Sequence, residues 1–413
     1  MSLTRRVFLR NGAFAVVGTS VVPAFLARAA WATSQQLAGK RLVVIFQRGA
    51  ADGLNIVVPH GERQYYALRP SINIPRKSVL DLDGFFGLHP SLAPFQPLWQ
   101  QHHLAIIHAA GSPDPTRSHF DAQDFMESGT PGLKATDDGW LNRCLHGLPK
   151  PVASSNFRAV ALGSSVPRIL SGSEPAIALT NIGDFGVGGK NAKATPIANT
   201  FESMYDESVD TVLHGTGEST FDAVKALKSA DPAKYQPATG ADYPKGHLGD
   251  GLRQLAQLIK ANLGVQVAFA DIGGWDHHVN EGAIEGQLAN VLREFSQSIA
   301  AFWTDLGNLG EDTVVVTMSE FGRTARENGD RGTDHGHANV IFVLGGPVKG
   351  GKVYGRWPGL DQSQLYEARD LALTTDFRQV IGEVVARHLG NADLKTVFPG
   401  FEANTKSFLK FLG

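Results

Sequence analysis

The sequence has a single cysteine and almost no net charge. Cys144 has no second thiol to pair with, so an internal disulfide framework is excluded and the residue is expected to be a small buried hydrophobe. With 38 basic and 40 acidic residues, the chain has no long-range attraction for nucleic acid or anionic lipid. Its 413 residues, 42% hydrophobic and 19% charged, have the composition of an ordinary globular protein.

The first 32 residues differ from the rest. Residues 4–10 (TRRVFLR) match the twin-arginine export signature, and a moderately apolar stretch follows over 13–26. A membrane anchor or an amphipathic first helix is the alternative, but Gly18 and Pro23 interrupt this stretch, which falls short of the roughly 20 apolar residues of a span. We expect export by the twin-arginine translocase, cleavage after Ala32, no membrane span afterwards, and a periplasmic or secreted location.

Continuous apolar runs are typical of strands that are buried on both faces of a sheet. They cover residues 42–46, 104–109, 265–270, 313–318 and 340–344. Helical patterns lie between them, at 92–101, 119–126, 248–262, 281–306 and 377–389. Strands that alternate with helices predict an α/β fold with a mostly parallel central sheet and helices on both faces. We expect one domain over 33–413, with an inserted cap at about 171–243 that is rich in small and polar residues.

Polar clusters adjoin the predicted strands. Segments 47–53 (QRGAADG), 271–278 (DIGGWDHH) and 319–323 (SEFGR) each follow a strand directly. Segment 116–121 (TRSHFD) follows another strand at a short distance, and segment 332–337 (GTDHGH) precedes the last one. Ligands of open α/β sheets bind outside the carboxyl ends of the strands, so we expect these clusters to converge.

The clusters hold enough carboxylates and imidazoles for two divalent ions. Zinc accepts both ligand types, whereas magnesium, manganese and calcium favour carboxylates. Two ions roughly 3.5 to 4 Å apart would clamp the attacking and leaving oxygens of a phosphoryl or sulfuryl displacement. The candidate ligands are Asp52, Asp276, His278, Glu320, Asp334, His335 and His337.

The candidate ligands also have structural interpretations. A turn would explain Asp52, an N-cap would explain Asp276, and a polar loop would explain 332–337. The position of Asp52 after a buried strand, and the pairing of Asp276 with His278 on one short loop, favour metal binding. Two imidazoles and a carboxylate within four residues make 332–337 the strongest of these clusters.

Ser118 opens a predicted helix, where a serine is most often an N-cap. In a functional interpretation its hydroxyl is a nucleophile activated by a nearby metal, and the helix amides receive the oxyanions of the transferred group. His119 would then bind metal or substrate. Arg48 and Arg323 would bind an anionic substrate group, or merely pair with neighbouring carboxylates. No Gly-x-Ser-x-Gly elbow surrounds Ser118, which argues against acyl transfer.

The same motifs carry a resemblance to a known family. The chain resembles the bacterial exported proteins of domain-of-unknown-function family 1501, which are similar to the alkaline phosphatase superfamily. The matching pieces are the leader and segments 48–53, 117–123, 273–278, 319–324 and 332–337.

This resemblance implies a two-metal hydrolase with an alkaline-phosphatase-like fold. It implies that Asp52 is the ligand after the first strand, that Asp276 and His278 are the next pair, and that His335 or His337 is the late histidine. At Glu320 the chain departs from the superfamily, which usually has an Asp-His pair there.

The sequence thus favours an exported metal-dependent hydrolase that acts on a phosphate or sulfate ester of a small molecule or a glycan. The alternative is a non-catalytic periplasmic or cell-envelope protein that retains the fold and binds a glycan or a partner chain. A redox metalloprotein is a third possibility, but the sequence offers no thiolate cluster for one.

Overall fold

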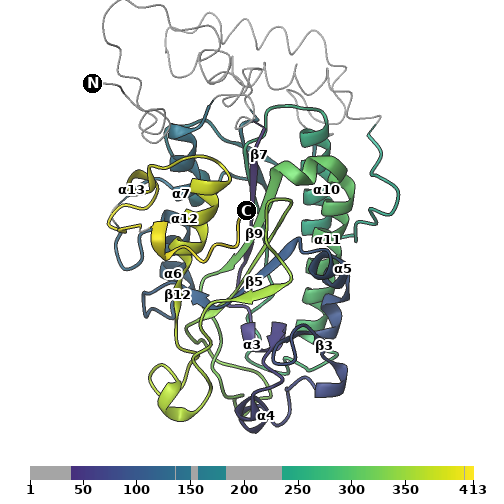
Figure 1. Ribbon diagram of the computed structural model, residues 1–413, viewed down its shortest axis with the longest axis vertical. Coiled ribbons are helices and arrows are strands. Elements are labelled where there is room, and N and C mark those ends of the chain that lie inside the picture. Colours follow the sequence, from purple (N-terminus) through teal and green to yellow (C-terminus); the bar gives the residue numbers. More distant parts are fainter. Residues whose placement is uncertain (1–38, 135, 150–156, 183–234, 404) are drawn as a thin grey trace, which may run out of the picture.

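The computed structural model describes residues 39–134, 136–149, 157–182, 235–403 and 405–413 (Figure 1). The predicted leader and most of the predicted cap over 171–243 therefore lie outside the described residues. Within the described residues, every helix is too short or too polar to cross a membrane.

A nine-stranded sheet forms the centre of the molecule, with strand order β11-β5-β10-β9-β1-β8-β6-β7 and with β12 paired to β5. The mostly parallel α/β sheet expected from the sequence is confirmed, with β10 as the antiparallel strand between β5 and β9. The strands are β1 (Arg41–Gln47), β5 (Leu104–Gly111), β6 (Ala159–Leu162), β7 (Ile177–Leu179), β8 (Val267–Ile272), β9 (Thr313–Ser319), β10 (Asn339–Gly345), β11 (Lys352–Tyr354) and β12 (Thr375–Asp376).

Helices cover both faces of this sheet, so its strands are apolar on both sides (Figure 1). Val43 and Ile45 of β1 belong to the core shared with α10 and α11, whereas Leu42 and Val44 belong to the core shared with α7 and α12. The helices are α3 (Gly53–Ile56), α4 (Arg63–Leu68), α5 (Gln96–Gln100), α6 (His119–Ser128), α7 (Trp140–Arg143), α10 (His247–Lys260), α11 (Gln287–Leu306), α12 (Phe377–Arg387) and α13 (Leu394–Val397).

One predicted helix boundary is wrong. The long helix expected from about residue 281 begins at Gln287, because Gly282 and Gly286 have positive φ and break the helical backbone. Residues 279–286 are instead a loop, and Asp276 does not cap the helix.

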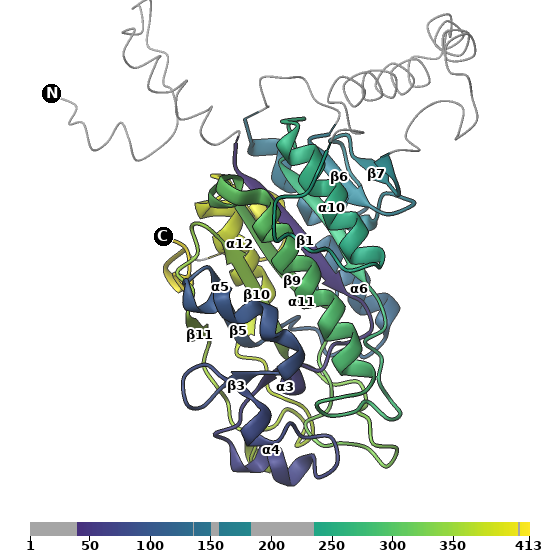
Figure 2. The ribbon, with the colours of Figure 1, turned by 90° about the vertical axis from the view of Figure 1, so that its right-hand side faces the viewer.

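Loops at one edge of the sheet gather around α3 and α4 (Figures 1 and 2). A small antiparallel sheet lies among these segments, with strands β2 (Val57–Val58), β3 (Leu80–Asp81) and β4 (Gly87–Leu88). This edge is formed by the C-terminal ends of the parallel strands. The polar segments that directly follow these strands therefore lie here.

Candidate metal centre

Segments from four parts of the chain deliver side chains to this edge. His119 is the first residue of α6 after β5, and Asp276 and His278 lie in the loop after β8. Glu320 directly follows β9. His335 precedes β10, and it reaches the same edge because β10 is antiparallel and begins where its neighbours end.

Four of these side chains meet, and we call His119, Asp276, His278 and His335 the His/Asp cluster. The Nε2 atom of His335 lies 3.0 Å from Nε2 of His119 and 3.0 Å from Nε2 of His278. Oδ1 of Asp276 lies 3.0 Å from Nε2 of His278 and 3.3 Å from Nε2 of His335. Donor atoms of His119, Asp276 and His335 all lie within 4.8 Å of one another, a spacing that a single ion can bridge.

The other ring nitrogen of each histidine in the cluster faces a hydrogen-bond acceptor. These Nδ1 contacts are to Glu320 Oε1 for His119 (2.8 Å), to Asp334 Oδ1 for His278 (3.1 Å) and to the Arg117 carbonyl for His335 (3.0 Å). An ionised carboxylate or a carbonyl only accepts, so each Nδ1 carries the proton. In the neutral rings, the Nε2 lone pairs therefore point toward the interior of the cluster.

Two Nε2 lone pairs held 3.0 Å apart repel each other unless the nitrogens share a proton or a metal ion. A zinc ion bound at 2.0 to 2.1 Å by tetrahedral ligands keeps neighbouring nitrogens about 3.4 Å apart, which is close to the spacing within the cluster. Metal-binding histidines also typically donate their second N–H to a carboxylate or carbonyl, as all three do here. The donor atoms of His119, Asp276 and His335 therefore fit one divalent ion.

Charge is divided unevenly within the cluster. The hydrogen bond with Glu320 raises the pKa of His119 despite the opposing effect of burial. Burial, followed by the charges of His119 and Arg323, lowers the pKa of His335. Burial disfavours the Asp276 carboxylate, but the hydrogen bond and charge of Arg323 outweigh this and lower the pKa of Asp276. The cluster thus combines an anionic oxygen with a neutral imidazole nitrogen.

Glu320 lies behind His119, on the side away from the shared nitrogens. Its fully buried carboxylate accepts hydrogen bonds from the Gly49 amide (2.8 Å), Gln123 Nε2 (2.9 Å) and Ser319 Oγ (3.0 Å), in addition to the His119 contact. Burial opposes its ionisation, but the hydrogen bond with His119 and the other donors lower its pKa. In this arrangement Glu320 orients His119, and direct metal ligation by Glu320 stays a prediction.

Asp52 lies outside the His/Asp cluster. It is 1% exposed, and both of its oxygens pair with the guanidinium of Arg69, Oδ1 at 2.9 Å from Nη2. Burial raises the pKa of Asp52, but Arg69 more than compensates and keeps it below its usual value. The structure thus assigns these oxygens to an ion pair, whereas the sequence predicted that they bind metal.

The two predicted anion-binding arginines also pair with carboxylates. Arg48 contacts Asp271 through Nε (2.5 Å) and Glu127 through Nη1 (2.9 Å). Arg323 is buried and donates from Nη1 to Oδ1 of Asp276 at 2.7 Å. Arg323 therefore supports the cluster through Asp276, and Arg48 lies outside it.

Three further predicted residues surround the cluster. Ser118 caps α6, and its Oγ accepts the Asp121 amide at 3.5 Å. Asp334 contacts His278, so it supports the cluster from behind. His337 is 6% exposed and stacks on Tyr366, with ring centroids 4.5 Å apart, which places its ring outside the cluster.

Sequence reasoning missed Glu281, which is fully buried beside the Asp52–Arg69 pair. Its oxygens accept hydrogen bonds from Asn55 Nδ2 (3.2 Å) and Thr333 Oγ1 (3.0 Å). Burial, followed by the charge of Asp52, raises the pKa of Glu281 well above its usual value. No pattern pointed to Glu281, because it lay in an apparent helix.

Gln123, also missed, holds Glu320 in place and follows His119 by one helical turn. That i, i+4 spacing is a signal that the sequence did contain, because residues four apart lie on the same face of a helix.

A family model described as "Protein of unknown function (DUF1501)" matches residues 39–397. No curated protein matches the sequence.

Several solved structures are similar to the chain. The lipoteichoic acid synthase LtaP from Listeria monocytogenes is 10% identical with a TM-score of 0.33; the match covers 74% of this chain and 65% of that one, so this chain spans slightly less than two thirds of it. The PsFucS1 sulfatase from Pseudoalteromonas sp. is 12% identical with a TM-score of 0.42, over 94% of this chain and 76% of that one. The zinc complex of the C-terminal periplasmic domain of EcEptC from Escherichia coli is 9% identical with a TM-score of 0.34, over 74% and 73%.

Proposed function

The chain belongs to the DUF1501 family, and from the His/Asp cluster that this member contains we propose that it is an exported metal-dependent hydrolase of phosphate or sulfate esters. One observation carries the proposal. The imidazole Nε2 atoms of His119 and His335 converge with the Asp276 carboxylate, beside His278, at the edge of the sheet where substrates of α/β proteins bind. Such convergence of donors is expected of a metal centre.

His119, Asp276 and His335 would hold the ion, and His278 lies beside them in contact with Asp276 and His335. A set of imidazoles and one carboxylate suits zinc or manganese better than magnesium or calcium, which prefer oxygen ligands. A bound divalent ion would supply Lewis-acid polarisation of a phosphoryl or sulfuryl oxygen. Among the described residues, the cluster provides donors for one ion, and a second ion stays a prediction.

The surrounding residues would position the cluster and the substrate. Glu320 and Asp334 fix the ring orientations of His119 and His278, and Arg323 keeps Asp276 ionised. Ser118 is the proposed nucleophile, because it precedes His119 in the chain and stands at the N-terminus of α6, whose free amides favour an oxyanion.

Export completes the proposal. The TRRVFLR segment of the leader supports recognition by the twin-arginine translocase, which carries proteins that have already folded. A metal could then be acquired before export, and the protein would act in the periplasm or outside the cell.

A non-catalytic envelope protein is the second candidate. It is favoured by the pairing of Asp52 with Arg69 and of Arg48 with Asp271, because these contacts engage groups that the hydrolase interpretation had assigned to metal and substrate. In this interpretation the His/Asp cluster binds an ion for stability alone, and the protein binds a glycan or a partner chain.

Metal content and ester hydrolysis of the purified protein test the proposal. We expect roughly one zinc or manganese ion per chain, and hydrolysis of p-nitrophenyl phosphate or p-nitrophenyl sulfate that chelation abolishes. His335→Ala should lose both, whereas His146→Ala, at an exposed histidine outside the cluster, should keep both. A bound ion without turnover would support the envelope protein, and absence of any bound ion would contradict both candidates.

A further inference from the structure

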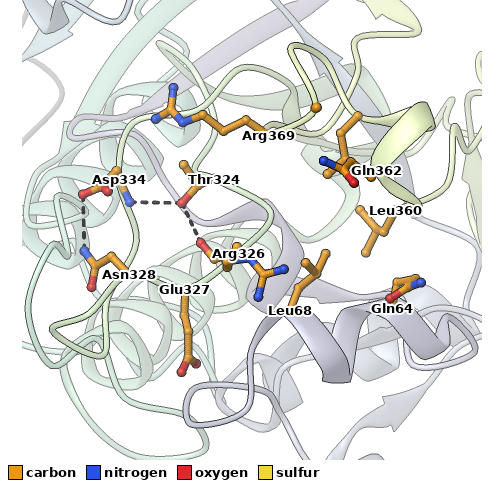
Figure 3. Close-up of a pocket in the computed structure, with 12 residues that line it drawn as sticks. Gln64, Leu68, Thr324, Arg326, Glu327, Asn328, Asp334, Leu360, Gln362 and Arg369 are labelled. Atoms are coloured by element: carbon orange, nitrogen blue, oxygen red, sulfur yellow. Dashed lines mark hydrogen bonds between the residues drawn. The ribbon is translucent and has the colours of Figure 1, made fainter.

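Figure 3 shows a cavity of about 430 Å³ whose wall includes Asp334, the residue that contacts His278 of the His/Asp cluster. Its other walls come from α4, from residues 324–328 and from residues 360–369, three segments that are distant in the sequence. Its volume is within the range of small-molecule sites, which is about 300 to 1,000 Å³.

Two residues connect the cavity wall to the cluster. Asp334 Oδ1 contacts Nδ1 of His278 at 3.1 Å, and Nη2 of Arg369 donates to the His335 carbonyl at 2.5 Å. A molecule in the cavity would therefore touch the residues that hold two of the proposed ligands. This proximity is expected of a subsite for the part of a substrate next to the reacting group.

Polar groups without partners face this space. Arg326 and Gln362 line the cavity from different loops, and neither side chain has a hydrogen bond or ion pair within the residues that the structure describes. The nearby Glu327 carboxylate does not neutralise Arg326 through a direct contact, because it accepts from the Ser71 amide (2.9 Å), the Ser71 hydroxyl (2.9 Å) and the Ile72 amide (3.0 Å). The cavity thus contains a cation and a carboxamide that are available to a ligand.

The remaining wall groups narrow the ligand class. Gln64 and Asn328 add carboxamides that already have partners, Asp361 Oδ1 (3.0 Å) and the His278 carbonyl (2.8 Å), and Leu68 and Leu360 are among the few apolar side chains. The two carboxylates in the wall are also engaged, Glu327 by Ser71 and Asp334 by His278. An aliphatic or aromatic ligand would cover the Arg326 guanidinium and the Gln362 amide without giving either a partner, at a cost of roughly 1 to 3 kcal/mol for each group. A polyol would satisfy the Gln362 carboxamide, and an oxyanion on that polyol would pair with Arg326.

We propose that this cavity is a substrate subsite for an acidic sugar unit, a polyol that carries a carboxylate or a sulfate, with Arg326 and Gln362 as the residues that select it. The inference rests on the proposed function, because it assigns this unit to the ester that the His/Asp cluster would hydrolyse. It adds a substrate class to that function, and it specifies the side of the cluster on which the sugar binds.

Binding of three sugars to the full chain tests the subsite by calorimetry or ligand-observed NMR. The probes are glucuronate, glucose 6-sulfate and glucose, so that the first two arms separate a carboxylate from a sulfate and the third lacks an anion. We expect at least one acidic probe to bind about tenfold more tightly than glucose. Equal binding of all three, or no binding of any, would overturn the proposal.

Two variants locate the interaction. Arg326→Gln should abolish the preference for the acidic sugar, and Arg293→Gln, at an exposed arginine of α11 outside the cavity, should preserve it. Arg326 is exposed, so its substitution leaves the fold intact. If Arg326→Gln keeps the full preference, the assignment to this cavity is wrong.

The sugar-binding test of the subsite and the hydrolysis test of the proposed function can succeed or fail independently. The binding measurement needs no turnover and can be repeated on His335→Ala. Selective binding that depends on Arg326, in a protein that hydrolyses neither p-nitrophenyl ester, would support the cavity and contradict the hydrolase. Metal-dependent hydrolysis, together with sugar binding that does not change in Arg326→Gln, would support the hydrolase and contradict the subsite.

Discussion

The Nε2 atoms of His119 and His335 lie 3.0 Å apart although the two residues are 216 positions apart in the chain. The contact forms because His119 follows a parallel strand, whereas His335 precedes the antiparallel β10. Their Nδ1 atoms are occupied by Glu320 and by the Arg117 carbonyl, which turns both Nε2 atoms inward. This pair is the centre of the proposed metal site.

Glu320→Gln should weaken metal binding without unfolding the protein. The amide cannot stabilise the His119 ring as a carboxylate does, and loss of such an outer partner typically lowers metal affinity by about 10- to 100-fold. Competition with a chelator of known affinity measures the change. Glu383→Gln is the matched control, since Glu383 is also fully buried but accepts from the Lys410 and Leu412 amides. Equal affinities of the two variants would refute the orienting role of Glu320.

Arg69→Met should destabilise the fold, because it leaves the buried Asp52 carboxylate without its main partner. Removal of one member of a buried ion pair costs about 3 to 5 kcal/mol of unfolding free energy. Urea denaturation measures this cost, with Arg293→Met as the exposed control. The double variant Asp52→Asn with Arg69→Met should recover part of the loss, and a double variant no more stable than Arg69→Met would argue against the pair.

The sequence predicted the strands well because a sheet covered on both faces requires continuous apolar runs, and the run at 340–344 indeed lies within β10. The direction of β10 was not predicted, because an apolar run does not indicate which way a strand runs in the sheet. Segment 332–337 precedes its strand, so a parallel β10 would have placed this segment at the opposite end of the sheet from the other clusters. It joins them because β10 is antiparallel to β5 and β9.

The candidate site was predicted in part. The structure brings His119, Asp276, His278 and His335 together, as the placement of polar segments beside strands suggested. The partner of Asp52 was not foreseeable, because Arg69 follows an ordinary surface helix and nothing in its local pattern marks it as buried. Long-range ion pairs of this kind depend on tertiary packing, which a single sequence does not encode locally.

Glu281→Gln should be well tolerated at neutral pH, and Glu281→Ala should not. Burial, followed by the charge of Asp52, holds the pKa of Glu281 well above its ordinary 4.5. We therefore expect the carboxyl to be protonated in the folded protein, and a neutral amide resembles that form. Because the folded pKa is raised, the unfolded chain binds fewer protons above pH 4.5, and stability falls as pH rises toward the folded pKa.

Urea denaturation across pH 5 to 9 tests this assignment of charge. Glu281→Gln should remove the part of the alkaline loss that Glu281 causes, so the variant gains on the wild type as pH rises. A stability difference between the variant and the wild type that stays constant from pH 5 to 9 would show that Glu281 is already ionised in the folded protein.

His388 should make the fold sensitive to acid. It is 3% exposed, and burial lowers its pKa from 6.5 to about 4, even though Nε2 lies 2.9 Å from the Arg41 carbonyl. The unfolded chain therefore binds the extra proton between pH 6.5 and 4, and the folded state loses about 2 kcal/mol between pH 7 and pH 5 from this group. Denaturation of His388→Gln at both pH values should show a smaller difference than the wild type, with exposed His146→Gln unchanged as the control.

Two substitutions of Ser118 distinguish its structural role as a helix cap from its proposed chemical role as a nucleophile. As the N-cap of α6 it contributes about 1 kcal/mol of stability, which Ser118→Ala should lose and Ser118→Asn should keep, because asparagine caps helices as well as serine does. As the nucleophile it would be essential, and neither alanine nor asparagine replaces an attacking hydroxyl. We therefore expect both variants to lose ester hydrolysis while only Ser118→Ala unfolds at lower urea. Retained turnover in both variants, with metal content unchanged, would assign Ser118 to capping alone and leave the attacking group to be found elsewhere around the His/Asp cluster.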